Sequence, residues 1–114
     1  MNELFRNTYA EIRLDNLIHN YHEIKKASGE NRFICPMVKA NAYGHGDICV
    51  AQALQEAGAQ HLGVGLIEEG LLLRSSGVTT RLLVFGIFDT QGAIEILRHK
   101  MIPVISTWGQ LESL

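Results

Sequence analysis

Residues 33–46 read FICPMVKANAYGHG, an uncharged run that ends at a lysine and continues into a turn with two glycines. Residues 33–38 have the length and composition of a buried strand. Asp47 then begins a helical pattern, with apolar residues at positions 48, 51, 54 and 57, and Gly58 ends it. The stretch therefore predicts a strand, a turn and a helix in that order.

The same alternation continues toward the C-terminus. Further strands are expected at 62–66, 81–85 and 102–105, and further helices at 68–76, from Asp89 or Thr90 to Lys100, and at 108–114. Strands that are apolar on both faces and alternate with helices form a parallel sheet covered by helices, with right-handed connections. The fold class is therefore α/β. The spacing alone leaves open whether the sheet closes into a barrel.

The first residues follow a different pattern. Residues 8–14 alternate polar and apolar side chains, which predicts a half-buried strand. Asp15 is then the expected N-cap of a first helix, which Gly29 ends. We therefore expect an N-terminal strand within residues 1–14 and the strand–helix region over 15–114.

Composition narrows the functional class. The 114 residues carry a formal net charge of −2 and are 46% hydrophobic, as in an ordinary globular protein. This charge gives no reason to expect nucleic acid or an acidic membrane as partner. No apolar run approaches the roughly 20 residues of a membrane span, and the N-terminus lacks a secretory h-region. We therefore expect a cytoplasmic protein in which Cys35 and Cys49 are reduced, packed thiols.

Lys39 is the first candidate for chemistry. Ligands of parallel α/β sheets bind at the carboxyl ends of the strands, and Lys39 directly follows the first expected strand. Its stem should leave a packed apolar strand, which would partly desolvate the amine and disfavour its charged form. A neutral amine is what Schiff-base chemistry needs. An inert, solvated surface lysine is the competing interpretation.

The turn after Lys39 offers groups for an anion. Tyr43 could donate a phenol to a phosphate oxygen, and Gly44 and Gly46 allow positive φ and close approach of backbone N–H groups. The carboxylate of Asp47 would repel an anion there, so the contribution of the helix end stays open. Glycine-histidine-glycine alone matches neither a Rossmann nor a P-loop fingerprint.

Other residues favour structural roles. Gly63 and Gly65 lie on one face of the second strand, where we expect packing more than ligand binding. His19 and His22 lie three residues apart, but no third ligand completes a metal site, so no metal is expected. His45 has no assigned role in proton transfer, and Glu68 with Glu69 should form a solvated helix start.

Residues 38–46 resemble the pyridoxal-phosphate attachment motif of alanine racemases, (I/V)-K-A-(D/N)-(G/A)-Y-G-H-(G/N), at all nine positions. Weaker similarities extend over nearly the whole chain: Ala10-Glu11-Ile12 with Leu14, Leu17 and Asn20; Ala57-Gly58-Ala59; Glu69 with Leu73-Arg74 and Gly77; and Leu82-Leu83-Val84. The chain departs from the family at Arg13, Met37, Gly65 and Gly70. None of these positions is the lysine or the tyrosine of the motif.

The resemblance implies a fold and a site. The fold would be the N-terminal part of a TIM-type (β/α)8 barrel of fold type III, with about four strand–helix units and without the C-terminal β-domain. Lys39 would bind pyridoxal 5'-phosphate covalently and act as acid or base on one face of the substrate carbon. Tyr43 would bind the phosphate. The opposite proton carrier in the family is a tyrosine from the partner subunit's β-domain, and no residue of this chain corresponds to it.

The function that the resemblance implies is interconversion of L- and D-alanine for peptidoglycan precursors, in a homodimer. Two alternatives remain: a racemase for another small amino acid such as serine, and a non-catalytic pyridoxal-phosphate-binding barrel. Because the second proton carrier is missing, the 114 residues alone should be inactive. Because a half-barrel exposes a strand edge and an apolar face, they should also self-associate.

Overall fold

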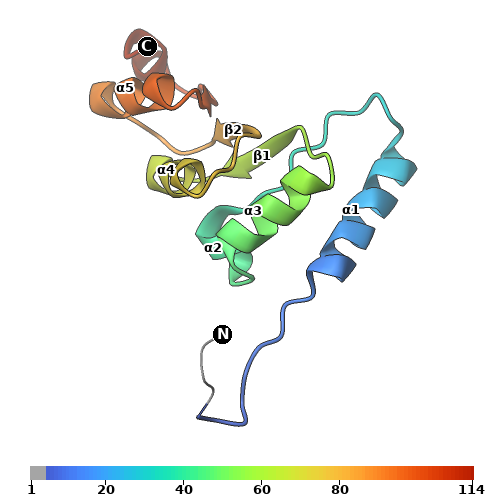
Figure 1. Cartoon of the computed structure of the whole chain (residues 1–114). Coiled ribbons are helices and arrows are strands. Elements are labelled where there is room, and N and C mark those ends of the chain that lie inside the picture. The colour runs from blue at the N-terminus through green and yellow to red at the C-terminus, as the bar shows by residue number, and fades with distance from the viewer. Residues whose placement is uncertain (1–4) are drawn as a thin grey trace.

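The computed structural model describes residues 5–114, which form a parallel sheet with helices packed against it (Figure 1). The strands are β1 (His61–Val64), β2 (Arg81–Val84) and β3 (Ile102–Pro103), in the order β1-β2-β3. Both pairings are parallel, as predicted, with His61 opposite Arg81 and Leu83 opposite Ile102. The predicted α/β class is confirmed.

The strand predicted at 33–38 is reduced to one parallel bridge, between Met37 and Gly63. The Val38 amide donates to the Gly63 carbonyl, and the Gly63 amide donates to the Pro36 carbonyl, both at 2.8 Å. A further bridge toward Phe33 would need an N–H at residue 36, and proline has none. The prediction was therefore right that this segment lies beside β1. It was wrong that all of residues 33–38 pair with the sheet as a strand.

The helices are α1 (Leu14–Ser28), α2 (Lys39–Tyr43), α3 (Asp47–Glu56), α4 (Ile67–Ser75), α5 (Thr90–Arg98) and α6 (Trp108–Glu112). The predicted starts at Asp47 and Trp108 are confirmed. Asp89 is the N-cap of α5, because its carboxylate accepts the Gly92 amide at 2.9 Å. The short helix α2 was predicted only as a turn.

The core lies between the sheet and the helices. Alternate strand residues face the helices and are fully buried: Leu62, Val64, Leu82 and Val84. The residues between them face the other side, where Phe85 remains 45% exposed. A Cβ at Gly63 would collide with the side chain of Met37, so the packing interpretation of Gly63 is the one the structure supports.

The strands follow one another across the sheet without reversing direction. Right-handed connections in that order place every crossover helix on the same face, as in a barrel wall, and α3 contacts α4, which contacts α5. The radius of gyration is 15.9 Å, against about 13 Å for a compact domain of this length. The chain is therefore less compact than a closed domain of its length, and the exposed coil of residues 5–12 adds to its extent.

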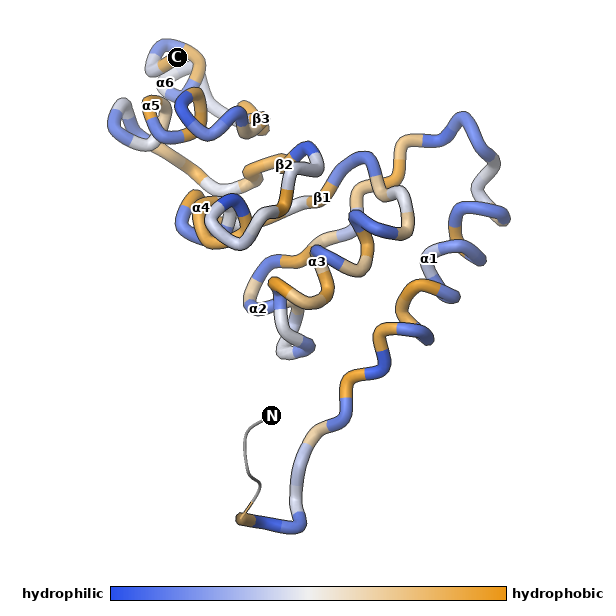
Figure 2. The backbone as a smooth tube through the Cα atoms, viewed as in Figure 1, coloured by the Kyte–Doolittle hydropathy of each residue, from blue (hydrophilic) through white to orange (hydrophobic). Residues whose placement is uncertain are grey.

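The N-terminal strand predicted within residues 1–14 is absent from residues 5–13, and residues 1–4 lie outside the described part. Residues 5–12 are exposed coil, and α1 begins at Leu14, with Arg13 rather than Asp15 as N-cap. A strand needs a neighbour for its backbone groups, and within residues 5–114 this segment has none. Hydrophilic and hydrophobic residues alternate along α1 (Figure 2), which buries Tyr21 and packs on α3. Gly29 ends it, as predicted.

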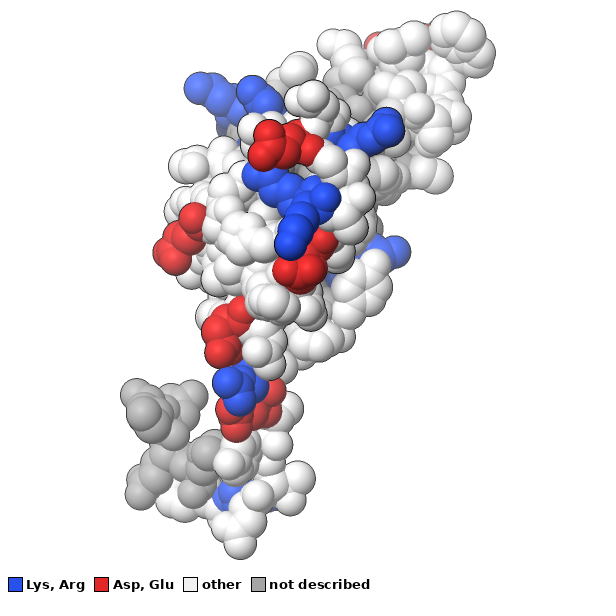
Figure 3. All heavy atoms as spheres, turned by 90° about the vertical axis from the view of Figure 1, so that its right-hand side faces the viewer, with Lys and Arg blue, Asp and Glu red and all other residues white. Residues whose placement is uncertain are grey.

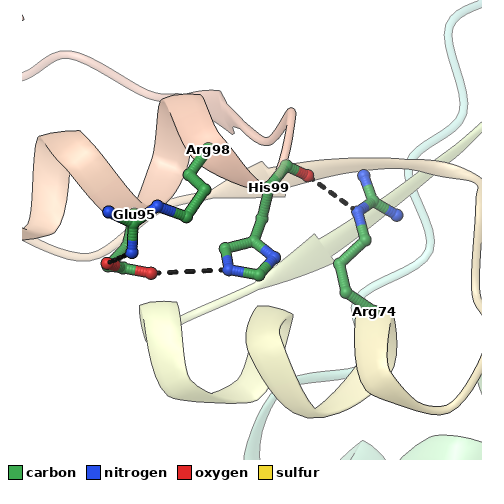
Figure 4. A network of polar contacts seen from close by, with 4 residues as sticks. All are labelled: Arg74, Glu95, Arg98 and His99. Carbon is green, nitrogen blue, oxygen red and sulfur yellow. Dashed lines mark hydrogen bonds and ion pairs between the residues drawn. The ribbon is translucent and has the colours of Figure 1, made fainter.

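Arg74 joins α4 to the loops around the sheet. Its guanidinium donates hydrogen bonds to the carbonyls of Val78, Thr80, His99 and Lys100 at 2.8–3.2 Å. Figure 4 shows the bond to His99 beside the ion pairs among Glu95, Arg98 and His99 at the end of α5. The partly buried Arg74 side chain thus links α4 to the backbone that follows α5.

No helix within residues 5–114 combines the length and the hydropathy that a membrane crossing requires.

Candidate active site

Lys39 lies where the sequence predicted, at the carboxyl edge of the sheet. The preceding residue, Val38, is 1% exposed in the core, whereas the Lys39 side chain is exposed. The stem of Lys39 runs beside Gly65, at the end of β1, where an added Cβ would lie 3.7 Å from Lys39 Cβ and 3.8 Å from Cδ. The missing side chain at Gly65 thus leaves a channel for the lysine.

The predicted desolvation of Lys39 is not present in this arrangement. The Lys39 side chain passes Gly65 and is exposed among residues 5–114. No carboxylate of this part of the chain lies within 4 Å of the amine. The amine is therefore reachable by a dissolved reactant and is not neutralised by an ion pair.

The four residues after Lys39 form a left-handed turn that the sequence did not predict. Ala40, Asn41, Ala42 and Tyr43 all have positive φ, between 50° and 56°. This conformation costs L-residues roughly 1–2 kcal/mol each, so the turn as a whole costs about 4–8 kcal/mol. Such backbone strain gathers at functional sites and persists only where surrounding contacts hold it.

Hydrogen bonds from within the turn offset part of this cost. The Asn41 carbonyl accepts the amides of Gly44 and Gly46, at 3.1 and 2.9 Å, and its side-chain oxygen accepts the Asp47 amide at 3.1 Å. Asparagine tolerates the left-handed region better than most residues. Gly44 and Gly46, with φ of 91° and 93°, have the positive φ that the sequence predicted.

Tyr43 ends this turn next to the lysine. Its ring centroid lies 5.9 Å from Lys39 Nζ, within the range of a cation–π contact. The side chain is 60% exposed, so its hydroxyl is free to meet a ligand. His45, by contrast, turns Nδ1 to the Ala42 carbonyl at 3.0 Å and supports the turn. The structure thus brings Lys39 and Tyr43 together, as the motif predicted.

Glu69 was wrongly predicted to be solvated with Glu68. Its carboxylate reaches back from α4 to the lysine segment, where Oε2 accepts the Ala40 amide at 2.7 Å and Oε1 accepts the Leu66 amide at 2.8 Å. Glu68 is exposed, as predicted. One sequence signal was the position of Glu69 at the third residue of a helix, which is typical of a capping box.

An apolar cavity of about 580 Å³ lies on the other side of the turn, under α1. Its lining includes Tyr21, Cys35, Tyr43 and His45 but not Lys39. Burial raises the pKa of the Cys35 thiol. Both thiols are unpaired, as predicted, but Cys49 is exposed rather than packed. The cavity therefore lies behind the site and does not receive the lysine.

Charge around the molecule is mixed. Acidic and basic side chains alternate on the face that contains α1 (Figure 3), so neither charge predominates there. The Arg13 guanidinium beside Asp15 lowers the pKa of that carboxyl. Within residues 5–114, no three histidine, cysteine or acidic side chains gather as metal ligands would. The groups that the structure places around Lys39 include its amine, the Tyr43 phenol and the Glu69 carboxylate that accepts the Ala40 amide.

The strand order and the edge that holds Lys39 define the class: a parallel α/β fragment with its candidate site at the carboxyl ends of the strands. The family model for the alanine racemase N-terminal domain matches residues 12–114. The chain belongs to this family, whose members are pyridoxal-phosphate enzymes.

Individual relatives agree with this assignment. Alanine racemase 2 of Caldanaerobacter subterraneus subsp. tengcongensis is 47% identical over 81 residues, which are 71% of this chain and 21% of the relative. The alanine racemase of Clostridium difficile 630 in complex with cycloserine matches at 32% identity and a TM-score of 0.89, covering 97% of this chain and 30% of that one.

One structural relative is named for a different substrate. The histidine racemase of Leuconostoc mesenteroides subsp. sake matches at 27% identity and a TM-score of 0.77, over 88% of this chain and 27% of that one. The chain thus spans between a fifth and a third of the length of these relatives. The expected N-terminal part of an alanine racemase barrel is confirmed, while the roles of Lys39 and Tyr43 remain predictions.

Proposed function

We propose that this chain provides the lysine-bearing part of the active site of a pyridoxal-phosphate-dependent alanine racemase. The observation that carries the proposal is the exposed Lys39 amine at the carboxyl edge, 5.9 Å from the Tyr43 ring and preceded by a fully buried valine. A reactive lysine needs an accessible amine on a rigid support, and this edge provides both.

The residues present fit the cofactor. An aldehyde can reach Lys39 Nζ, the absence of a side chain at Gly65 leaves a cradle beside the lysine stem, and the exposed Tyr43 hydroxyl can donate to a phosphate oxygen. When bound, the cofactor would draw electrons from the substrate's α-carbon and so acidify its proton.

The chain's own residues would then divide the work. Lys39 Nζ would hold the cofactor and would take or return the proton on one face of the substrate's α-carbon. Tyr43 would orient the cofactor's phosphate. Tyr9 and Tyr21 do not lie at this edge, so the opposite face needs a proton carrier from outside residues 5–114. We propose that a partner subunit in a homodimer supplies it.

A small amino acid is the substrate class we favour, because cycloserine, held by the Clostridium relative, is itself a small amino-acid derivative. Alanine is the specific substrate proposed, since two of the three relatives above are named alanine racemases. Serine and a non-catalytic cofactor carrier remain the competing functions. Conversion of alanine by a completed enzyme would separate them.

Borohydride trapping tests the cofactor assignment. The chain is incubated with pyridoxal phosphate, reduced, digested and mapped by mass spectrometry. We expect modification at Lys39 well above that at Lys26, an exposed lysine on α1 that serves as control. Loss of the main product in Lys39→Ala but not in Lys26→Ala supports the proposal, and equal labelling of both lysines contradicts it.

Activity is tested in a chimaera. Residues 1–114 replace the corresponding segment of the Caldanaerobacter relative, and D-isomer formation is followed from L-alanine and L-serine. We expect turnover of L-alanine that Lys39→Ala abolishes. Cofactor trapping without turnover of either amino acid would favour the carrier function, and faster turnover of L-serine would favour a serine racemase.

A further inference from the structure

Glu69 makes two backbone contacts that no role described so far requires. Its two carboxylate oxygens accept amides from different elements: Ala40 at 2.7 Å, directly after the lysine, and Leu66 at 2.8 Å, at the start of α4. Ala40 is 29 residues away in sequence. Glu69 therefore ties the lysine segment to the first turn of a helix that packs on the sheet.

The Ala40 amide belongs to the peptide group that joins Lys39 to the left-handed turn. The turn's later amides find partners locally: Ala42 donates to the Val38 carbonyl at 3.0 Å, and Gly44 donates to the carbonyls of Ala40 and Asn41. Within residues 5–114, the acceptor of the Ala40 amide is Glu69. The orientation of this peptide group, and hence the direction in which Lys39 leaves the backbone, depends on that carboxylate.

Gly65 leaves room beside the Glu69 carboxylate. An added Cβ there would lie 3.2 Å from Glu69 Oε1 and 3.7 Å from Lys39 Cβ. The Glu69 carboxylate and the Lys39 stem therefore both pack beside Gly65, which has no side chain. The Leu66 amide binds Oε1, so both oxygens of Glu69 are held by backbone amides. A fixed supporting group is what precise placement of a reactive side chain needs.

We propose that Glu69 is a positioning residue for Lys39: its carboxylate holds the strained turn so that the amine stays at the carboxyl edge. This rests on the proposed role of Lys39 in binding the cofactor. Each oxygen of Glu69 accepts one backbone amide, and the carboxylate forms no ion pair with Lys39 among residues 5–114.

The test compares Glu69→Ala, Glu69→Gln and the neighbouring Glu68→Ala in the full chain. The first readout is amide hydrogen exchange of the peptide that contains residues 39–46, measured by mass spectrometry. Loss of a hydrogen bond to a charged acceptor should speed exchange at Ala40 by about tenfold to a hundredfold in Glu69→Ala. Glu69→Gln keeps one carbonyl acceptor and should fall between, while Glu68→Ala should match the wild type.

The second readout is the rate of pyridoxal-phosphate trapping at Lys39 relative to Lys26 in the same sample. We expect a severalfold lower ratio in Glu69→Ala, partial rescue in Glu69→Gln and no change in Glu68→Ala. General destabilisation would instead speed exchange in β2 and α5 as well. If Glu69→Ala does not fold, the same comparison with Glu69→Gln decides.

The two proposals fail in different ways. If wild-type Lys39 is not labelled more than Lys26, the proposed function is wrong. Hydrogen exchange at Ala40 then still reports on its hydrogen bond to Glu69. If Lys39 is trapped in the wild type and both Glu69 variants leave the exchange and the trapping ratio unchanged, Glu69 does not position the lysine.

Discussion

Replacing Arg74 with methionine should lower the free energy of unfolding far more than replacing Arg98 does. The guanidinium makes four hydrogen bonds to carbonyls, from Nε to His99 at 3.0 Å, from Nη1 to Val78 and Thr80 at 2.8 Å, and from Nη2 to Lys100 at 3.2 Å. Methionine keeps the apolar stem and removes all four donors. At about 1 kcal/mol net for each bond, the expected loss is about 3–5 kcal/mol.

One feature supports the upper half of that range. Lys100 has a φ of 52°, a conformation that an L-residue adopts at a cost and that the bond from Arg74 helps to hold. Burial lowers the pKa of Arg74, but arginine starts from a value so high that the charge persists near neutrality. The effect should therefore be nearly constant between about pH 6 and pH 9.

The assay is urea unfolding at low protein concentration, read by circular dichroism, with an unchanged denaturant slope as the sign of two-state behaviour. Arg98→Met is the matched control, because Arg98 makes one exposed ion pair with Glu95, which is worth about 0–1 kcal/mol. Arg74→Lys retains a charge but not the planar fork and should lose about half as much as Arg74→Met. If Arg74→Met loses no more stability than Arg98→Met, the four hydrogen bonds of Arg74 do not stabilise the fold.

Three further outcomes follow from other contacts. Gly86→Ala should destabilise the chain by about 1–3 kcal/mol in the same unfolding assay, because its Cβ would strike the backbone carbonyl of Gly65. Asp89→Ala should cost about 1 kcal/mol through loss of the α5 N-cap. Burial raises the pKa of Cys35, so its alkylation by iodoacetamide, followed by peptide mass spectrometry, should reach its plateau at a higher pH than that of free cysteine. Exposed Cys49 should react faster at neutral pH.

The sequence predicted the architecture well because the local spacing of hydrophobic residues indicates each strand and each helix. The boundaries of α3, α4 and α5 follow from glycine stops, an aspartate cap and apolar spacing, all of which act within a few residues. The error at residues 8–13 has a different origin. Alternation makes a strand possible, but the backbone needs a neighbouring strand, and local sequence does not reveal whether one exists.

The site was only half predictable for the same reason. The motif identified Lys39 and Tyr43 as neighbours, and glycine marked the positive φ at Gly44 and Gly46. The left-handed conformation between them has little local signal, because alanine disfavours it and Asn41 alone tolerates it well. One of its contacts reaches Glu69, across 29 residues. Single-residue propensities cannot predict a conformation whose stabilising group lies on another element.

The same alternation that builds the core also places the site. Val38, Val64 and Val84 end three successive strand segments, and each is at most 1% exposed because it faces the helices. The residue after each valine must then lie at the carboxyl edge on the opposite side of the sheet. Lys39 and Gly65 occupy two of these positions, one with the amine and the other with the space for its stem. A smaller residue at position 38 should therefore weaken the core and loosen the lysine together, because the buried valine and the exposed amine share one stretch of backbone.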